Sequence, residues 1–571
     1  MYRGGNALRY GAANLGGAIN FVSPSGHTAP LFGARAEFGS FDYFRAQGSH
    51  AQVIGPWDYY FSGSHFATNG FREHAERDLQ RFHINFGYRI SENIENRTYL
   101  IAGRGGKELA AGLTKEGAEE DPTQDTDSPP FMGRNPQDLF LNLRDERYTL
   151  LFANKTAIVR GDQAMTATVF ARSYDLFHPL GNGPFFHTIF DIERHSFGTR
   201  LTYDNAAPLF GHRNRFSAGF DVQGSIENTE QHDNQSGTRG PVTGDDTSTA
   251  YNYALYFEDQ YYLMEPLALI AGLHAMHTTR EVEDGFLGDN PLFDVMADDS
   301  FSENFTTASP KIGLVYDLDP ESNLYLTFTR SYEPPTFIEL RNQSGPADFT
   351  IVDAQEGSTI EAGTRGEIPG LSWDFAVYHT WVDDELLPQT DLDGNDIGTL
   401  NLDDTRHLGV EIGFDTGLLG PEGLLYRTRA IAGGRIRLRL AYHMQDFDID
   451  DDPVFGDNDI PGIPEHFLRS EFLYEHPSGF YLGPNLEWIP RAYPVDLANT
   501  DFVDPFAMLG IKVGYRPQQG FGVFFEGRNL TDKEHVSSAN IVADARTGFG
   551  PPRIFFPGDG VAFYGGVEWR W

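Results

Sequence analysis

The sequence predicts an all-β protein in the form of a 22-stranded antiparallel transmembrane β-barrel. Apolar residues recur at every second position in many segments of the 571-residue chain. Short and long connections between these segments alternate along its length. The number of segments is even, as expected for a closed antiparallel barrel whose two ends lie on the same side of the membrane.

Period two indicates strands, because successive side chains of a strand point to opposite faces. Residues 82–90 carry apolar or aromatic side chains at even positions and polar residues or glycine at odd positions. Residues 216–222 and 561–571 alternate in the same way. An amphipathic helix would repeat every 3.6 residues, and no long segment does so. Each such segment therefore has one apolar and one polar face.

The connections distinguish a membrane barrel from a soluble sandwich. Short ones are predicted at residues 516–520, 475–479, 368–370, 317–321, 264–266 and 53–57. Long polar ones lie between them, at residues 491–504, 446–465, 387–404, 331–355, 280–304, 226–248, 174–191 and 105–145. Short turns on one side and long loops on the other are typical of outer-membrane barrels.

The count gives 22 strands within residues 28–571, the first near residues 31–39 and the last near 561–571. A membrane strand needs only about 9–11 residues, so the chain is long enough for all of them and their loops. A barrel this wide is expected to need a plug in its bore.

Composition excludes several classes of function. The chain has 43 basic and 82 acidic residues, a formal charge of −39, which argues against nucleic acid as a partner. It has no cysteine, which excludes disulfides, thiolate metal sites and cysteine nucleophiles. No run of about 18 apolar residues predicts a membrane-spanning helix. No signal peptide is recognised at Met1.

Several motifs give the chain a family resemblance. Residues 3–11 (RGGNALRYG) and 15–22 (LGGAINFV) resemble the end of the plug domain of TonB-dependent outer-membrane receptors. Segments similar to that family's barrel follow in the family's order, at residues 309–313, 325–335, 361–363, 407–411 and 527–532. Trp571 resembles the terminal aromatic residue that the barrel-assembly machinery reads. The first of these motifs and residues 70–74 (GFREH) most resemble siderophore receptors of the ferric citrate type.

The resemblance implies that residues 1–27 are the C-terminal remnant of a plug domain and residues 28–571 the receptor barrel. Relative to the family, the chain is expected to be truncated at its N-terminus, without a signal peptide, the box that engages TonB, or a complete plug. The implied function is TonB-dependent uptake of an iron complex across the outer membrane of a Gram-negative bacterium. Two alternatives are a passive porin-like channel and a receptor for cobalamin, haem or another metal chelate.

The same resemblance implies partners and a latch. The partners are the TonB energising complex, in a full-length form, outer-membrane lipid and lipopolysaccharide, and a small-molecule metal chelate. Family members pair plug arginines with strand glutamates that face the bore, and Arg3, Glu361 and Glu411 match such positions. The alternative is that the two glutamates are solvated carboxylates of the bore.

The candidate ligand contacts lie on the predicted long loops. Residues 174–191 combine aromatic rings with histidines, and binding pockets join apolar walls to a few polar groups. The candidates are Phe177, His178, Phe185, Phe186 and His187, with Arg341 and Arg491 on other long loops. The alternative is that these residues pack the loops or anchor the barrel at the membrane edge. The acidic surface favours cationic or neutral cargo and opposes ferric citrate, and the sequence leaves this conflict open.

No catalytic or metal motif is recognised. G-x-S-x-G, H-E-x-x-H and Walker A patterns are absent, so no enzyme is predicted. The acidic segment that starts at Asp446 lacks the glycine and glutamate of an EF-hand loop, so no metal site and no cofactor are predicted. His274 and His277 are three apart on a strand and are expected to face opposite ways, which argues against a haem site there.

Overall fold

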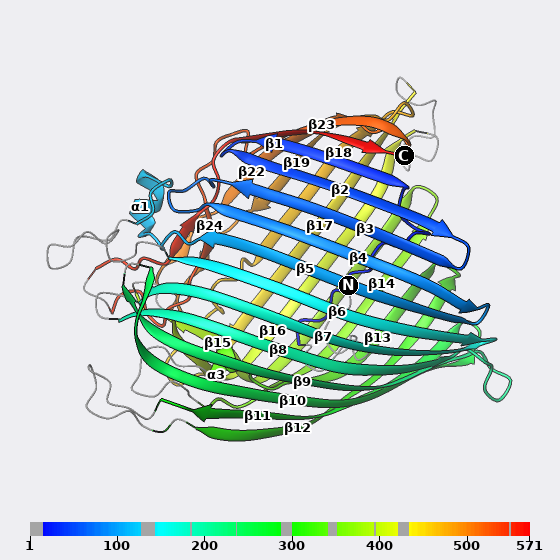
Figure 1. Ribbon diagram of the computed structural model, residues 1–571, viewed down its shortest axis with the longest axis horizontal. Coiled ribbons are helices and arrows are strands. Elements are labelled where there is room, and N and C mark those ends of the chain that lie inside the picture. The colour runs from blue at the N-terminus through cyan, green and yellow to red at the C-terminus, as the bar shows by residue number, and fades with distance from the viewer. Residues whose placement is uncertain are drawn as a thin grey trace.

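The computed structural model shows a closed antiparallel barrel (Figure 1). It describes residues 15–126, 143–182, 186–235, 237–286, 298, 300–340, 351–392, 396–420, 433–547 and 550–571. Twenty-two strands form one continuous sheet. Strand β1 pairs with β2 on one side and with the last strand, β26, on the other, which closes the barrel. The predicted fold class and strand number are confirmed.

The barrel strands are β1 (Phe32–Gly39), β2 (Tyr43–Ile54), β3 (Trp57–Thr68), β4 (Arg77–Ser91), β5 (Ile94–Glu108), β6 (Arg144–Arg160), β7 (Gln163–Asn182), β8 (Phe186–Asn205), β9 (Asn214–Gln235), β10 (Thr238–Met264), β11 (Leu267–Asp284), β12 (Phe301–Asp319), β13 (Ser322–Glu333), β14 (Gln355–Ile368), β15 (Leu371–Thr390), β16 (Asp396–Leu419), β17 (Arg435–Ile449), β18 (His466–Glu475), β19 (Phe480–Ile489), β22 (Phe506–Tyr515), β23 (Gly520–Arg528) and β26 (Ala562–Arg570). Loop elements are the helices α1 (Lys115–Glu120) and α3 (Phe337–Leu340), and the paired short strands β20 (Tyr493–Pro494) with β21 (Phe502–Val503) and β24 (Val536–Ala539) with β25 (Phe555–Pro557).

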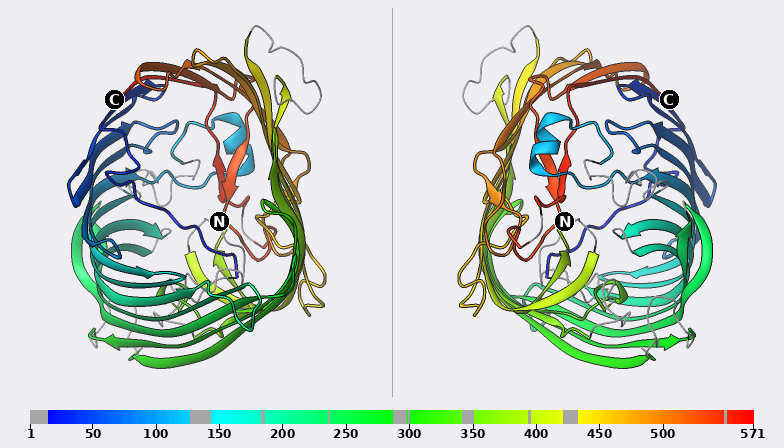
Figure 2. Two further views of the ribbon diagram at one scale, coloured as in Figure 1. Left: turned by 90° about the vertical axis from the view of Figure 1, so that its right-hand side faces the viewer. Right: turned by 90° about the vertical axis from the view of Figure 1, so that its left-hand side faces the viewer.

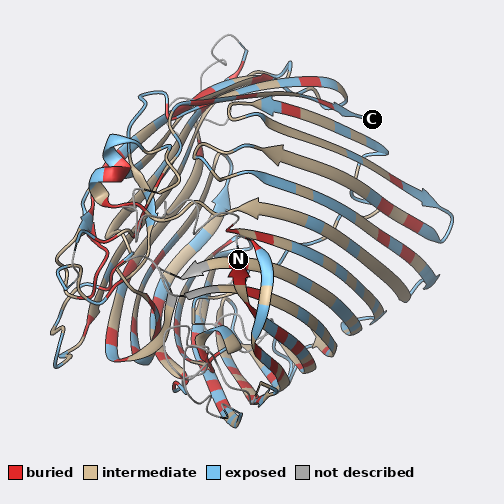
Figure 3. Cartoon of the chain, turned by 60° about the vertical axis from the view of Figure 1, so that its left-hand side comes forward, coloured by how far each residue is buried: buried red, intermediate tan, exposed pale blue. Residues whose placement is uncertain are grey.

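The two faces of the sheet differ as a membrane barrel requires. On β13, Leu324, Leu326 and Phe328 are exposed, whereas Thr327 and Thr329 on the other face are buried. The same banding of buried and exposed residues is visible along many strands in Figure 3. Apolar side chains that cover the outside of a barrel, with polar ones inside, are stable where the surrounding solvent is lipid.

Connections of different length gather at the two ends of the barrel. One end, the turn end, has mostly short connections, such as the two residues between β2 and β3 and the two between β14 and β15. The connection between β16 and β17, at residues 420–434, is the longest there. The opposite end, the loop end, carries the connections after β5, β11, β13, β17, β19 and β23. The predicted alternation is confirmed for these connections, whereas the loop-end connections β1–β2, β7–β8 and β9–β10 are as short as turns.

Three predicted long loops are wrong in extent, because each is largely strand. Residues 174–191, 226–248 and 387–404 belong mainly to the hairpins β7–β8, β9–β10 and β15–β16, which continue past the apolar band. Above the membrane both faces of a strand meet water, so polar residues occupy both and the period of two disappears from the sequence.

The long connections pack together into a cap at the loop end. Leu113, Val495, Val503, Ile554 and Phe555 are fully or almost fully buried and belong to one hydrophobic cluster. This cluster joins the connections after β5, β19 and β23. Figure 2 shows α1 and the β24–β25 pair inside the outline of the barrel when it is seen along its length. In the part of the chain that the structure describes, no helix is both long and apolar enough to cross a bilayer.

Candidate ligand-binding site

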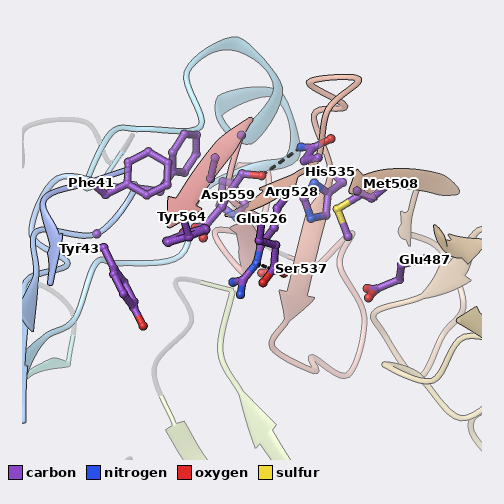
Figure 4. Close-up of a pocket in the computed structure, with 18 of the residues that line it drawn as sticks. Phe41, Tyr43, Glu487, Met508, Glu526, Arg528, His535, Ser537, Asp559 and Tyr564 are labelled. Atoms are coloured by element: carbon purple, nitrogen blue, oxygen red, sulfur yellow. Dashed lines mark hydrogen bonds and ion pairs between the residues drawn. The ribbon is translucent and has the colours of Figure 1, made fainter. Parts of the chain in front are cut away.

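The loop-end half of the bore contains a cavity of about 1260 Å³. One side is formed by β2–β5 and the other by β17–β19, β22 and β23. The β24–β25 pair of the cap also lines it. Figure 4 shows Tyr43 and Tyr564 on one side of this space, Glu487 and Met508 on the other, and Arg528 with Glu526 between them.

One side of the cavity is aromatic. The rings of Tyr43 and Tyr564 meet edge to face, with centroids 5.0 Å apart. The Arg528 guanidinium lies 4.5 Å from the centroid of the Tyr564 ring, and its Nε donates to Glu526 Oε1 at 2.9 Å. Cation–π contact and ion pairing together hold this arginine in place. Aromatic walls with a few fixed polar groups are typical of small-molecule sites.

The opposite side is charged, but its charges are paired. Arg469 Nε donates to Glu487 Oε2 at 2.7 Å. Glu471 accepts from both Arg439 and Lys512, each at 3.2 Å. A ligand that binds here would have to compete with these ion pairs.

Arg72, in the GFREH segment at residues 70–74, ties the connection after β5 to the wall of the cavity. Its guanidinium donates to the carbonyl oxygens of Ala111 at 2.7 Å, Gln124 at 3.0 and 3.1 Å, and Asp125 at 2.8 Å. The Glu73 amide also donates to the Thr123 carbonyl at 2.7 Å. Burial raises the pKa of the Asp125 carboxyl in this connection. Sequence resemblance drew attention to these five residues but did not reveal this role.

Replacing Arg72 with alanine should loosen residues 109–126. Three buried or half-buried carbonyls would lose a charged donor, at a cost of about 1.5–3 kcal/mol in local stability. Amide hydrogen exchange in this segment should accelerate by about 10-fold or more. Arg104→Ala is a matched control, because Arg104 lies on the outer face of β5 and its described contact is the Tyr148 ring, 5.5 Å away. Equal exchange in the two variants would contradict the role assigned to Arg72.

The GRNLTD motif at residues 527–532 lies where β23 ends, and it holds the two ends of the following connection together. Asn529 has a positive φ of 45° and Asp532 one of 47°. The Asn529 amide group donates to the carbonyls of Lys533 at 3.0 Å and Asp559 at 3.1 Å. Asp532 accepts from the Val561 amide at 3.1 Å. Asparagine and aspartate tolerate this conformation and bond the local backbone, which explains their place here.

Residues 15–27 cross the bore from one wall to the other (Figure 2). At one end, the Leu15 amide hydrogen-bonds to Glu333. The Leu15 side chain lies so close to Gly357 that a Cβ added to this glycine would be only 2.7 Å from Leu15 Cδ1. At the other end, Asn85 Nδ2 donates to the Pro24 carbonyl at 2.6 Å, and the Gly26 amide donates to Asp58 Oδ1 at 3.0 Å. This segment is thus held to β13 and β14 on one side and to β3 and β4 on the other.

The predicted latch is not assembled among the described residues, because Arg3 lies outside them. Glu361 faces the bore, is 6% exposed, and accepts from the Tyr325 hydroxyl at 2.6 Å. Glu411 also faces the bore, with His443 Nδ1 4.0 Å away. The inward orientation expected of both glutamates is therefore present, and the latch itself stays a prediction.

The predicted ligand contacts are scattered. Phe177 faces outward, between the guanidinium groups of Arg144 at 5.0 Å and Arg239 at 4.6 Å from its ring. His178, the next residue, faces the bore, and its Nδ1 lies 3.0 Å from the Arg144 carbonyl.

The remaining predicted contacts are one ion-paired arginine and four residues that are described in part or not at all. Arg491 is exposed and paired with Glu465 at 2.6 Å. Phe185 and Arg341 lie outside the described residues, as do the side chains of Phe186 and His187 on β8. Their roles stay predictions.

His274 and His277 lie on opposite faces of β11. His274 is 3% exposed and faces inward, whereas His277 is exposed. Over the ranges given above, no three histidine or carboxylate side chains gather in a way that could hold a metal ion.

Comparison with known proteins gives a consistent result. Residues 71–530 match the family model described as TonB dependent receptor-like, beta-barrel. The fold is similar to the ferric citrate transporter FecA in its unliganded form, with a TM-score of 0.80 and 16% identity over 100% of this chain and 83% of that one. It is also similar to the siderophore receptor PiuA from Acinetobacter baumannii, with a TM-score of 0.77 and 13% identity over 100% and 85%. The copper transporter OprC gives a TM-score of 0.72 and 15% identity over 95% and 80%.

Proposed function

Because this chain belongs to the TonB-dependent receptor family, as the match over residues 71–530 shows, we propose that it imports an iron complex of the siderophore kind in an energy-dependent way. The family consists of outer-membrane receptors, so the barrel lies in an outer membrane, and we place it in that of a Gram-negative bacterium. The observation that supports an imported chelate most directly is the cavity of about 1260 Å³ between the cap and the bore. The proteins with a similar fold include ferric citrate, siderophore and copper transporters, so the fold alone leaves the cargo open.

The proposed mechanism has two steps and no covalent chemistry. The chelate enters at the loop end and is held between the aromatic side of the cavity, with Tyr43 and Tyr564, and the cap. The TonB complex then pulls on the plug, of which residues 1–27 are the proposed C-terminal remnant, and a path along the bore opens. Glu361 and Glu411 are the proposed barrel side of the plug latch, with Arg3 as their partner.

Outer-membrane lipid and lipopolysaccharide are the proposed surroundings of the apolar outer face, and the barrel-assembly machinery is the proposed reader of the last strand. Trp569 and Trp571 lie at its end, with ring centroids 6.1 Å apart. Aromatic side chains at this position suit the interface between lipid and water.

Uptake of radiolabelled iron complexes by cells tests the proposed function. The gene, with its upstream reading frame, would be expressed in a Gram-negative strain that lacks its own siderophore receptors. We expect uptake of at least one iron complex, and we expect it to stop when TonB is deleted or the proton gradient is dissipated. Uptake that persists without TonB would instead make the protein a passive channel. No uptake of any metal complex would contradict the proposal.

A further inference from the structure

One side of the bore is basic, although the chain as a whole carries a formal charge of −39. Five cationic side chains face inward from four neighbouring strands, and we call them the basic wall: Arg77 and Arg81 on β4, Lys107 on β5, Arg147 on β6 and Arg172 on β7. Their orientation follows from strand alternation, because Arg81 shares its face with His83 and Asn85, which contact the segment in the bore.

The strand register brings these cations together. Arg77 pairs directly with Lys107, and Lys107 pairs with Asp145. Arg147 is two residues further along β6 on the same face. Arg81 lies level with Gly103 and Thr149, and Gly103 presents no side chain beside it.

Carboxylates neutralise the basic wall only in part. Asp145 accepts from Arg147 Nε at 2.7 Å, and Lys107 Nζ lies 3.7 Å from the same carboxylate. Arg77, Arg81 and Arg172 are exposed, and none of the described residues forms an ion pair with them. Burial lowers the pKa of Lys107, and so do Arg147 and Arg77. The lowering caused by the two arginines is expected where positive charges lie close together. Lys107 lies beyond the apolar band, because the outer face of the barrel at the same height carries the charged residues Asp78 and Glu146.

We propose that the basic wall binds an anionic metal chelate, whose outer atoms include carboxylate or similar oxyanions. The proposal rests on the function proposed above and names the charge class of its cargo. Guanidinium groups match carboxylates with two parallel hydrogen bonds, so a compact polyanion can contact Arg77 and Arg81 together. At 0.1 M salt, charges act over only about 10 Å, so the acidic outer surface repels such a chelate little once it is in the bore. The basic wall thus removes the objection to anionic cargo that the net charge raised.

Equilibrium dialysis of the purified full chain tests this proposal, with labelled ferric citrate as the anionic probe and an uncharged iron–trihydroxamate complex as the neutral one. We expect ferric citrate to bind about tenfold more tightly, and more weakly as salt is raised. The variant Arg77→Gln/Arg81→Gln removes two cations without leaving a buried carboxylate unpaired. We expect it to lose about tenfold in affinity for ferric citrate and to keep its affinity for the neutral complex.

The control variant Arg104→Gln/Arg160→Gln removes the same charge from the outer face of β5 and β6 and should bind ferric citrate as the parent does. Unchanged affinity in the Arg77→Gln/Arg81→Gln variant, or an equal loss in the control, would overturn the basic wall as a site. Tighter binding of the neutral complex would overturn the charge class. Each of these results leaves the proposed function intact if cells still import an iron complex through TonB. Loss of all TonB-dependent uptake, with ferric citrate still bound through the basic wall, would instead overturn the proposed function alone.

Discussion

Replacing Arg97 with alanine should destabilise the barrel by about 3–5 kcal/mol, because it leaves the buried carboxylate of Asp58 without its guanidinium partner. Arg97 donates to both oxygens of Asp58, at 3.0 and 2.8 Å, and to Asn85 at 2.9 Å. The Asp58 side chain is only 5% exposed and also accepts from the Gly26 amide. The same change should therefore release residues 23–27 from the wall. Chemical denaturation in lipid vesicles and hydrogen exchange of the segment would measure the two effects.

A matched pair of variants separates lost charge from lost packing. Glu95→Gln removes another partner of Arg97, but Glu95 is 43% exposed, so its loss should cost less than about 1 kcal/mol. Arg97→Met combined with Asp58→Asn removes both buried charges and should recover much of the stability that Arg97→Ala loses. If Arg97→Ala proves as mild as Glu95→Gln, the cluster does not hold the segment.

Replacing Asp496 with alanine should open the cap. This residue is fully buried and accepts four hydrogen bonds, from the amides of Thr500 at 2.7 Å, Asp501 at 3.1 Å and Ala545 at 3.1 Å, and from the Thr500 hydroxyl at 2.5 Å. It thereby joins the connection after β19 to the connection after β23. Unpaired buried donors should cost about 2–4 kcal/mol in total.

Limited proteolysis would detect that opening as new cleavage within residues 490–505 and 540–547. Asp459→Asn is a suitable comparison, because the backbone of Asp459, not its carboxylate, bonds Asn499. Asp496→Asn keeps one acceptor oxygen and should fall between alanine and the parent. Protection that is the same in Asp496→Ala and in the parent would show that the hydrophobic cluster alone holds the cap.

The sequence was most informative where one face of a strand meets lipid. There the period of two is enforced residue by residue, as at Phe82, Ile84 and Phe86, so strand number and closure could be predicted. Above the membrane that constraint disappears, which is why the β7–β8 and β9–β10 hairpins were expected to be loops. The position of Phe177 shows the consequence, since a residue expected in a loop pocket lies on the outer face of a strand.

The contacts that hold the bore segment and the cap were harder to predict, because their residues meet only in the folded barrel. Arg97 and Asp58 are 39 positions apart, and Asp496 and Ala545 are 49 apart. Nothing in their local pattern distinguishes them from other charged residues. For Arg97 and Asp58 the sequence did contain a signal. Both are charged, and strand alternation indicates that both face the bore. The GRNLTD and GFREH motifs were visible only through family resemblance, and the contacts of Asn529 and Arg72 give them a physical reason.

The most direct test of the central claim, that one face of each strand meets lipid and the other the bore, is spin labelling along β4. The chain has no cysteine, so single cysteines can be placed without other changes. In vesicles, labels at positions 82, 84 and 86 should be accessible to oxygen, and labels at 77, 81 and 83 to a water-soluble nickel chelate, with a period of two. Labels that are equally accessible to the nickel chelate at all six positions would contradict the account.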